Sequence, residues 1–254
     1  MAKCFNEASY SIIVTGRPLE FNVRRVPGGE NRLLFINGYG GTFEQPGVKW
    51  YMNRFRDHDL DVTYIQLPTR VNDFTNEVLG PCLEVEKEMG KHVAAGFSFG
   101  GLTLAYMHGS RRRIFLSPFW AVNDRWSGKG HKAVVNVLSS ITKPLLPRQF
   151  DKEEAGELAV DDDMEGMPKL VSFRTIEQFF KAQENIPPPE ENDVVFYSPK
   201  DTIISPRVIE NRGIEAHPYQ GGHMFYLTRG RKEVTKNILL KIDEGFSQSH
   251  SSTS

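Results

Sequence analysis

The stretch GFSFGG at residues 96–101 is a G-x-S-x-G motif followed by one further glycine. The preceding residues, KHVAA at 91–95, end in a short apolar run typical of a buried strand, and the following LTLAYM at 102–107 favours a helix. Ser98 therefore lies where a strand turns sharply into a helix, which is the context of a nucleophile elbow. Neighbouring glycines have a steric reason there, because residues without a Cβ let strand and helix approach closely. The hexapeptide alone also fits a helix that Ser98 merely caps.

The composition indicates a single large globular domain. The chain has 254 residues, is 39% hydrophobic and 25% charged, and has a formal net charge of -1. This balance gives no reason to expect a nucleic acid partner or an anionic membrane. The two cysteines imply no disulfide framework and suit a reducing compartment. Without a signal peptide or a run long enough to span a membrane, the chain is expected to be cytoplasmic.

Strand-like runs alternate with helical periodicity in the first half of the chain. Strands are expected at 33–36, 61–67, 91–95 and 113–117, and helices at 44–56, 77–89 and 102–107. The alternation predicts an α/β fold with a mostly parallel central sheet flanked by helices. The runs at 9–14 and 19–26 are expected to form an edge hairpin. The arginines at 111–113 are interpreted as the solvated start of a strand rather than a binding patch.

The pattern changes between residues 118 and 190. Helices are expected at 131–142 and 170–186, so this segment is predicted to be a helical lid inserted into a core formed by 1–117 and 191–246. The acidic run at 151–165 is interpreted as a solvated connector, although repulsion of anionic substrates is an alternative. Strands at 193–198 and 213–218 and helices at 207–212 and 233–242 complete the core. The serine-rich tail at 247–254 is expected to be disordered.

Two polar residues follow later strands and match the needs of a serine nucleophile. A serine hydroxyl requires a base within hydrogen-bond reach, and the base requires an acid that orients it. Asp201 follows the strand at 193–198, and His223 follows the last strand after a pair of glycines. Since the carboxyl ends of parallel strands meet at one edge of the sheet, these side chains are expected to lie close to Ser98. The order Ser, Asp, His is the one expected in such a sheet.

Each of these two residues has a rival in the sequence. His217 is close to His223, but it lies within the end of a strand and a proline follows it. Asp124 follows the strand at 113–117 and is the alternative acid. We favour His223 because catalytic groups lie on loops beyond strand ends, and Asp201 because of the chain order.

Four segments together resemble the α/β-hydrolase family: GFSFG at 96–100, SPKD at 198–201, GGHMF at 221–225 and NGYG at 37–40. The first three resemble the elbow, the acid loop and the histidine loop, and the G-G-H-x-F form is similar to acyl thioesterases of that family. The fourth stands where many members have His-Gly-x-x-Gly, with Asn37 in place of the histidine. The resemblance covers nearly the whole chain and is weakest in the insertion.

The resemblance implies roles for individual residues. Ser98 would be the nucleophile, His223 the general base and then acid, and Asp201 the group that holds the imidazole. The main-chain N–H groups of Tyr39 and Phe99 would form an oxyanion hole. The substitution at Asn37 does not affect a hole made of main-chain groups, but it leaves the role of that side chain open.

Other chemistries find no support in the sequence. It has no G-x-x-x-x-G-K-[ST] phosphate loop, no H-E-x-x-H motif and no paired C-x-x-C, so neither a cofactor nor a metal is expected. Residues 57–59, Asp-His-Asp, are interpreted as a solvated loop rather than metal ligands.

The sequence therefore predicts a serine hydrolase that cleaves a carboxylic ester or thioester of a small-molecule acyl substrate through an acyl-enzyme on Ser98. Phe119 and Trp120 are expected to line an apolar substrate pocket, with Phe179 and Phe180 as further candidates, although these rings also suit the insertion's own core. The alternatives are a ligand-binding protein of the same fold without turnover, and a hydrolase of an amide or carbon–carbon bond. The acyl chain length and the oligomeric state are not determined by the sequence.

Overall fold

The computed structural model describes residues 19–123, 145–147, 152–164 and 170–247, and these contain a central seven-stranded sheet. Its strands are β1 (Asn22–Val26), β2 (Asn31–Ile36), β3 (Leu60–Gln66), β4 (Val93–Phe97), β5 (Arg113–Leu116), β8 (Val194–Tyr197) and β9 (Glu215–Pro218). Their order is β1-β3-β2-β4-β5-β8-β9. Only β1 is antiparallel to its neighbour. This sheet confirms the predicted mostly parallel α/β architecture.

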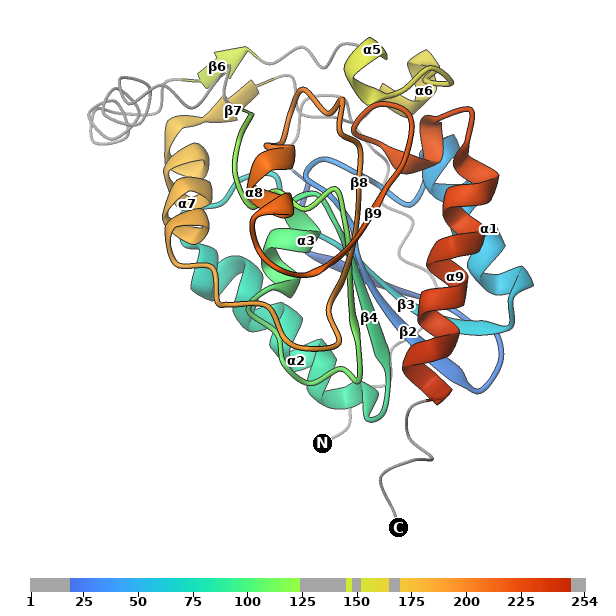
Figure 1. The fold of residues 1–254 in the computed structure, drawn as a ribbon. Helices are drawn as coiled ribbons and strands as arrows, with labels where there is room; N and C mark the ends of the chain where they lie inside the picture. Colours follow the sequence, from blue (N-terminus) through green and yellow to red (C-terminus); the bar gives the residue numbers. More distant parts are fainter. Residues whose placement is uncertain (1–18, 124–144, 148–151, 165–169, 248–254) are drawn as a thin grey trace.

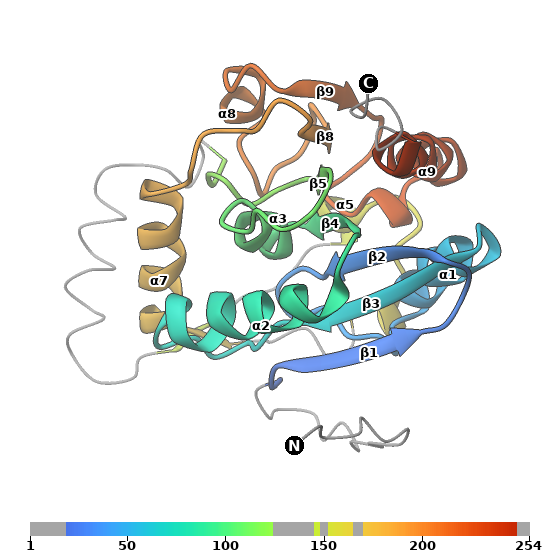
Figure 2. The ribbon, with the colours of Figure 1, turned by 90° about the horizontal axis from the view of Figure 1, so that it is seen from below.

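Helices cover both faces of the sheet (Figures 1 and 2). One face carries α1 (Pro46–Asp57) and α9 (Arg231–Ser247), and the other carries α2 (Gly80–Met89), α3 (Phe99–Leu104), α7 (Phe173–Glu184) and α8 (Pro206–Glu210). The residues of β2 alternate between the two cores: Leu34 and Ile36 pack under α2 and α3, and Leu33 and Phe35 pack under α1 and α9. A strand without a polar face is stable only when both of its faces are covered, and the unbroken apolar run at 33–36 is covered in this way.

The helix expected at 77–89 is divided where the sequence contains Gly80 and Pro81. A single π-helical turn, η1 (Thr75–Leu79), precedes α2, and Pro81 lies in the first turn of α2. Proline has no N–H to donate to the preceding turn, and its ring obstructs a regular α-helical continuation. The helix predicted at 77–89 therefore exists, but its α-helical part begins only at Gly80.

The predicted insertion is described only in part. It contains β6 (Leu145–Pro147) and β7 (Leu170–Ser172), which pair antiparallel, and the short helices α5 (Lys152–Ala155) and α6 (Asp161–Met164). The helix expected at 170–186 is shorter than predicted because its first three residues form β7, and Ser172 then caps α7 by accepting a hydrogen bond from the N–H of Thr175. The helix expected at 131–142 and the hairpin strand at 9–14 lie outside the described residues. The expected tail does too, except Ser247, which ends α9. The domain boundaries and the lid role stay predictions.

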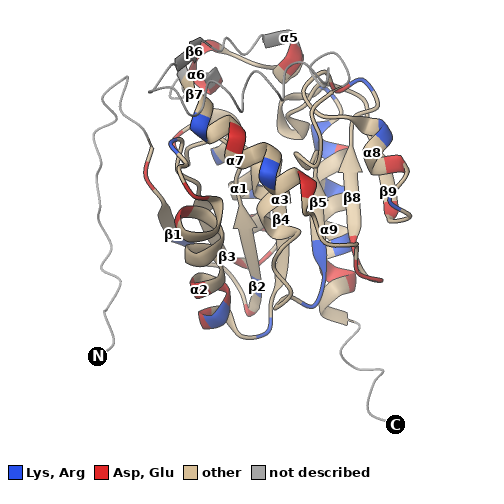
Figure 3. Cartoon of the chain, turned by 90° about the vertical axis from the view of Figure 1, so that its left-hand side faces the viewer, with Lys and Arg blue, Asp and Glu red and all other residues tan. Residues whose placement is uncertain are grey.

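The helix α7 is amphipathic, and its apolar face packs on the core. Its outer face carries both signs of charge (Figure 3), and Glu177 pairs with Arg174 and with Lys181 at 2.8 Å each. Its inner face buries Phe173 and Phe179. Arg174 and Lys181 are about half exposed, and surface pairs of this kind contribute little stability, so the buried rings account for most of the attachment.

The interpretation of the acidic run at 151–165 as a solvated connector fits Glu157, Asp161 and Asp162, which are exposed, but it is wrong for Asp163. Asp163 is 4% exposed, and its Oδ1 accepts a hydrogen bond of 2.6 Å from the N–H of Gly47 at the start of α1. Ala155 is completely buried in the core under α1 and α9. A carboxylate at a helix N-terminus is stabilised by unpaired N–H groups and by the helix dipole. The sequence around Asp163 does not reveal that the N-terminus of α1 is its partner.

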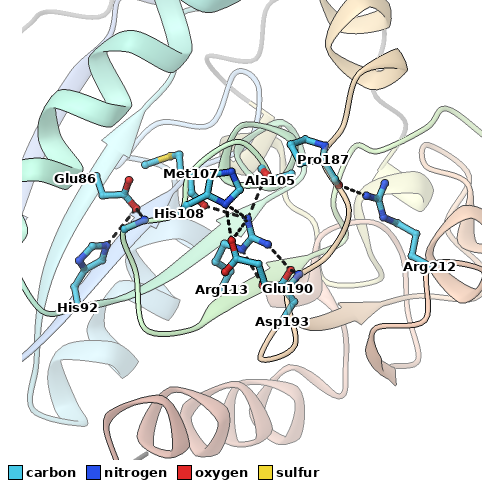
Figure 4. A network of polar contacts seen from close by, with 11 residues as sticks. Glu86, His92, Ala105, Met107, His108, Arg113, Pro187, Glu190, Asp193 and Arg212 are labelled. Atoms are coloured by element: carbon cyan, nitrogen blue, oxygen red, sulfur yellow. Dashed lines mark hydrogen bonds and ion pairs between the residues drawn. The ribbon is translucent and has the colours of Figure 1, made fainter. Parts of the chain in front are cut away.

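The interpretation of the arginines at 111–113 as solvated is also wrong, because two of the three are buried. The guanidinium of Arg113, 1% exposed, donates to both carboxylate oxygens of Asp193 at 2.8 and 2.6 Å and to main-chain oxygens of residues 105 and 107 (Figure 4). Arg112 pairs with Glu244 of α9 at 2.7 Å. These side chains join strand β5 to the start of β8 and to α9.

The Arg113–Asp193 pair leads to a stability prediction. Asp193→Ala removes the carboxylate that accepts two hydrogen bonds from the buried guanidinium and leaves it only the half-exposed Glu190, at 3.4 Å. The substitution is expected to lower the free energy of unfolding by about 3 kcal/mol, measured by urea denaturation. The matched control is Glu84→Ala, because Glu84 pairs with Lys87 at 2.9 Å with both side chains more than 70% exposed. This control is expected to change the free energy by less than about 1 kcal/mol. Equal effects of the two substitutions would contradict the assignment.

Candidate active site

Ser98 forms the turn between β4 and α3, with φ 51° and ψ -115°. This region is unfavourable for a residue with a Cβ and is kept only when the surrounding structure enforces it. The two flanking glycines provide that enforcement. A Cβ on Gly96 would lie 2.6 Å from the oxygen of Gly100, and a Cβ on Gly100 would lie 2.1 Å from the oxygen of Ile36. Strand and helix are therefore in main-chain contact, as the motif predicted.

The structure brings Ser98, His223 and Asp201 together in one hydrogen-bonded chain. The distance between Ser98 Oγ and His223 Nε2 is 2.9 Å, and that between His223 Nδ1 and Asp201 Oδ2 is 2.7 Å. In the tautomer whose Nδ1–H donates to this carboxylate, Nε2 accepts from the serine hydroxyl. The other oxygen of Asp201 accepts from the N–H groups of Ile203 and Ile204 at 2.8 and 3.1 Å. The acid is thus held in a fixed orientation.

The rival histidine lies elsewhere. His217 is part of β9, where its ring stacks on Phe196 and its Nε2 is 2.7 Å from a carboxylate oxygen of Glu215. His223 lies in the loop beyond β9, which is the position that the sequence argument favoured. The rival acid, Asp124, lies outside the described residues. The catalytic roles of the three residues stay predictions.

A buried tyrosine supports the histidine loop from the side of the sheet, and sequence reasoning missed it. The hydroxyl of Tyr219 donates to the main-chain oxygen of His223 at 3.0 Å and lies 2.8 Å from Ser117 Oγ. Burial, together with the charge of Asp201, raises the pKa of Tyr219 well above its usual range, so the hydroxyl keeps its proton and remains a donor. The only sequence feature that could have indicated this role is the position of Tyr219 directly after the last strand.

The loop after β2 lies next to Ser98, where the resemblance placed an oxyanion hole. A Cβ on Gly38 would be 3.2 Å from the Cβ of Ser98. Tyr39 anchors this loop, because its hydroxyl donates to the main-chain oxygen of Thr69 at 2.6 Å. Phe99 is the first residue of α3, and the first N–H groups of a helix have no partner within it.

The side chain of Asn37 has a structural role that the sequence left open. Its amide nitrogen donates to the hydroxyl of Tyr64 at 2.6 Å, and its oxygen accepts from the hydroxyl of Tyr51 at 3.2 Å. A Cβ on Gly41 would lie 2.2 Å from the same amide nitrogen. Asn37 therefore braces the loop 38–41 against α1 and β3.

A small cavity of about 30 Å³ opens beside Ser98. Water needs roughly 10–15 Å³ in such a space, so the cavity has room for about two water molecules. Mostly apolar and aromatic residues line it, namely Gly38, Tyr39, Gly41, Phe97, Ser98, Phe99, Phe119, Phe179, Ile203, His223, Met224 and Tyr226. Sequence reasoning named Phe119 and considered Phe179, but it missed Ile203, Met224 and Tyr226.

Trp120, which the sequence assigned to the pocket, is not among the lining residues. Its ring packs on Phe115 at 4.8 Å between centroids, and the guanidinium of Arg212 lies 4.7 Å from its centroid. Phe180 is not a lining residue either. Neighbouring residues of a turn point in different directions, so Phe119 faces the cavity while Trp120 faces the core behind β5.

The described residues offer no second kind of site by two criteria. They contain no group of three or more His, Cys, Asp or Glu side chains able to hold a metal ion, and no helix long and apolar enough to cross a membrane. Cys82 is buried, and burial raises the pKa of its thiol, so it is not a candidate nucleophile. The cytoplasmic location stays a prediction.

Several solved structures resemble this fold. A monoacylglycerol lipase from Paleococcus ferrophilus aligns with a TM-score of 0.74 at 15% identity, covering 89% of this chain and 100% of its own. A soluble variant of monoglyceride lipase from Saccharomyces cerevisiae aligns with a TM-score of 0.69 at 14% identity, covering 89% and 92%. An esterase from Exiguobacterium antarcticum aligns with a TM-score of 0.63 at 14% identity, covering 88% and 95%. Neither a protein-family model nor a curated protein matches the sequence. The chain has the α/β-hydrolase fold.

The close contact beneath Ser98 can be tested with a glycine pair. Gly100→Ala would place a methyl group 2.1 Å from the oxygen of Ile36 and is expected to lower the free energy of unfolding by about 3 kcal/mol. Gly230→Ala is the control, because a Cβ there meets nothing within 4 Å. Thermal unfolding of both variants measures the difference, and a Gly100→Ala protein as stable as the control would contradict the contact.

Proposed function

We propose that this protein is a serine hydrolase that cleaves a carboxylic ester through an acyl-enzyme on Ser98. The observation that carries the proposal is the continuous hydrogen-bonded chain from Ser98 Oγ through His223 to Asp201, at 2.9 and 2.7 Å. An inert serine has no need of an imidazole that faces its hydroxyl and of a buried carboxylate behind that imidazole. The resemblance to lipases and esterases supports an ester as substrate. A thioester with the same acyl group would undergo the same steps.

The first half of the reaction forms the acyl-enzyme. Ser98 Oγ attacks the carbonyl carbon of the ester while His223 Nε2 takes the hydroxyl proton, and Asp201 stabilises the resulting imidazolium. The negative charge that develops on the carbonyl oxygen is accepted by the main-chain N–H groups of Tyr39 and Phe99, and one such donor typically lowers the barrier by about 3 kcal/mol. The imidazolium then gives its proton to the alcohol oxygen as the carbon–oxygen bond breaks.

The second half releases the acid. His223 removes a proton from a water molecule, whose oxygen attacks the acyl carbon, and the same two N–H groups hold the second oxyanion. Collapse of this intermediate breaks the bond to Ser98 Oγ, which recovers its proton from His223. The aromatic cavity beside Ser98 suits an apolar acyl group.

Nitrophenyl esters and a fluorophosphonate probe test the proposal. We expect turnover and covalent labelling of the wild type, and a loss of about 10⁴-fold or more in kcat with no labelling for Ser98→Ala. Ser247→Ala, an exposed serine at the end of α9, is the control and should behave as the wild type. A wild-type protein that is neither labelled nor active would contradict the proposal and favour a ligand-binding protein. Labelling without ester turnover would point instead to an amide or a carbon–carbon bond.

The ring of Phe179 is expected to limit the length of the acyl group. It is 5% exposed and lies 4.3 Å from the ring of Phe99, 5.2 Å from that of Tyr39 and 5.9 Å from that of Phe119, so it closes one wall of the cavity. Phe179→Ala should extend the cavity and raise kcat/KM for octanoyl relative to acetyl nitrophenyl ester by about tenfold. A chain-length series measures this ratio.

The matched control for Phe179 is Phe74→Ala. Phe74 also packs on Phe99, with centroids 6.0 Å apart, but it is not among the residues that line the cavity. Both substitutions are expected to cost about 3–5 kcal/mol of stability. Only Phe179→Ala should alter the chain-length preference, and an equal change in both variants would contradict a direct role of Phe179.

A further inference from the structure

The main chain of the insertion runs directly beside the loop that carries His223. The N–H of His223 itself donates to the oxygen of Glu154 at 2.9 Å, and that of Met224 donates to the oxygen of Ala155 at 2.9 Å. Further along, the N–H of Leu158 donates to the oxygen of Leu227 at 2.8 Å. The two segments are far apart in sequence, so these bonds depend on tertiary structure alone.

Two glycines, one on each side, allow this close approach. A Cβ on Gly222 would lie 2.7 Å from the oxygen of Glu154 and 2.9 Å from that of Ala155. A Cβ on Gly156 would lie 2.6 Å from the oxygen of Leu227, and its φ of +154° is one that side chains rarely adopt. The contact therefore leaves no room for a side chain on either glycine. An accidental surface contact would not place this restriction on both segments.

The other end of the same segment is fixed to helix α1 by Asp163. Its Oδ1 accepts from the N–H of Gly47, as described above, and its Oδ2 accepts from the N–H of Val160 at 3.3 Å. A Cβ on Gly47 would lie 2.7 Å from the ring of Tyr226, so α1 also abuts the end of the histidine loop. Residues 154–163 are therefore bound at both ends: Asp163 is hydrogen-bonded to α1, and Glu154 is hydrogen-bonded to His223.

We propose that residues 154–163 hold the catalytic histidine in place, and that Asp163 is the positioning residue that locks this segment to α1. The inference rests on the proposed function of Ser98, His223 and Asp201. Asp163 is not among the residues that line the cavity, so it acts on the reaction only through the position of His223. Its loss should lower kcat and leave KM nearly unchanged, because substrate contacts are retained while the base is displaced from the serine hydroxyl.

The experiment compares three carboxylate variants in the full chain. Asp163→Ala removes both hydrogen bonds, Asp163→Asn keeps an acceptor but loses the charge at the helix N-terminus, and Asp162→Asn makes the same charge change at an exposed neighbour. Gly222→Ala disrupts the interface from the opposite side. Two properties are measured: hydrogen exchange of the peptide that contains His223 and Met224, and the kinetics of ester turnover and fluorophosphonate labelling.

We expect Asp163→Ala and Gly222→Ala to raise exchange of this peptide about tenfold or more, while peptides of β2 and β4 keep wild-type exchange because the opening is local. The labelling rate and kcat should fall about tenfold, with KM within about twofold of the wild type. Asp163→Asn should be intermediate, and Asp162→Asn should behave as the wild type. Where Asp163→Ala fails to fold, Asp163→Asn and Gly222→Ala still decide the question.

Two results would overturn the inference: unchanged exchange at the histidine loop in the Asp163 variants, or increased exchange with undiminished labelling. Failure of the proposed function has a different signature. In that case the wild type itself is neither labelled nor active, and the exchange data alone decide whether Asp163 holds the histidine loop.

Discussion

The contact of α3 with β2 and β4 beneath Ser98 is the constraint on which the candidate site depends. Because Gly96 and Gly100 have no side chain, the main chain of α3 contacts the main chains of β4 and β2. This contact keeps Ser98 at a positive φ between strand and helix. The same contact places the loop after β2 beside Ser98 and the N-terminus of α3 next to it. One edge of the sheet therefore carries the hydroxyl of Ser98, the main-chain amides of the loop 38–41 and the N-terminus of α3. The strands β8 and β9 end at the same edge.

His223 reaches Ser98 from a loop that is supported on two sides. Tyr219 holds its main chain from the sheet, and residues 154 and 155 hold it from the insertion. The bonds to residues 154 and 155 join main-chain groups only, whereas the bond from Tyr219 uses its side-chain hydroxyl. Residues of the predicted insertion therefore contact the candidate site in two ways: Phe179 lines the cavity, and the main-chain oxygens of Glu154 and Ala155 accept from the histidine loop.

Much of the fold and of the candidate site was predictable because the signals are local. The unbroken apolar run at 33–36, the proline at the start of α1 and the glycines around Ser98 each reflect conditions within a few residues. His223 was separated from His217 by its place beyond a strand end. The predictions failed where a partner is distant in sequence: Arg113 and Asp163 are charged residues that a local pattern assigns to solvent, and Asp193 and Gly47 provide their buried partners.

The sequence by itself determined the alternation of strands and helices, the elbow and the order of Ser98, Asp201 and His223, because periodicity and turn chemistry act over short distances. Only the tertiary structure decided which rings face the cavity, how Asn37 braces its loop and which acidic residue is buried. Those outcomes depend on the direction of single side chains and on contacts between segments that are separate in the sequence, from Asn37 with Tyr64 to Gly47 with Asp163, and no local pattern encodes them.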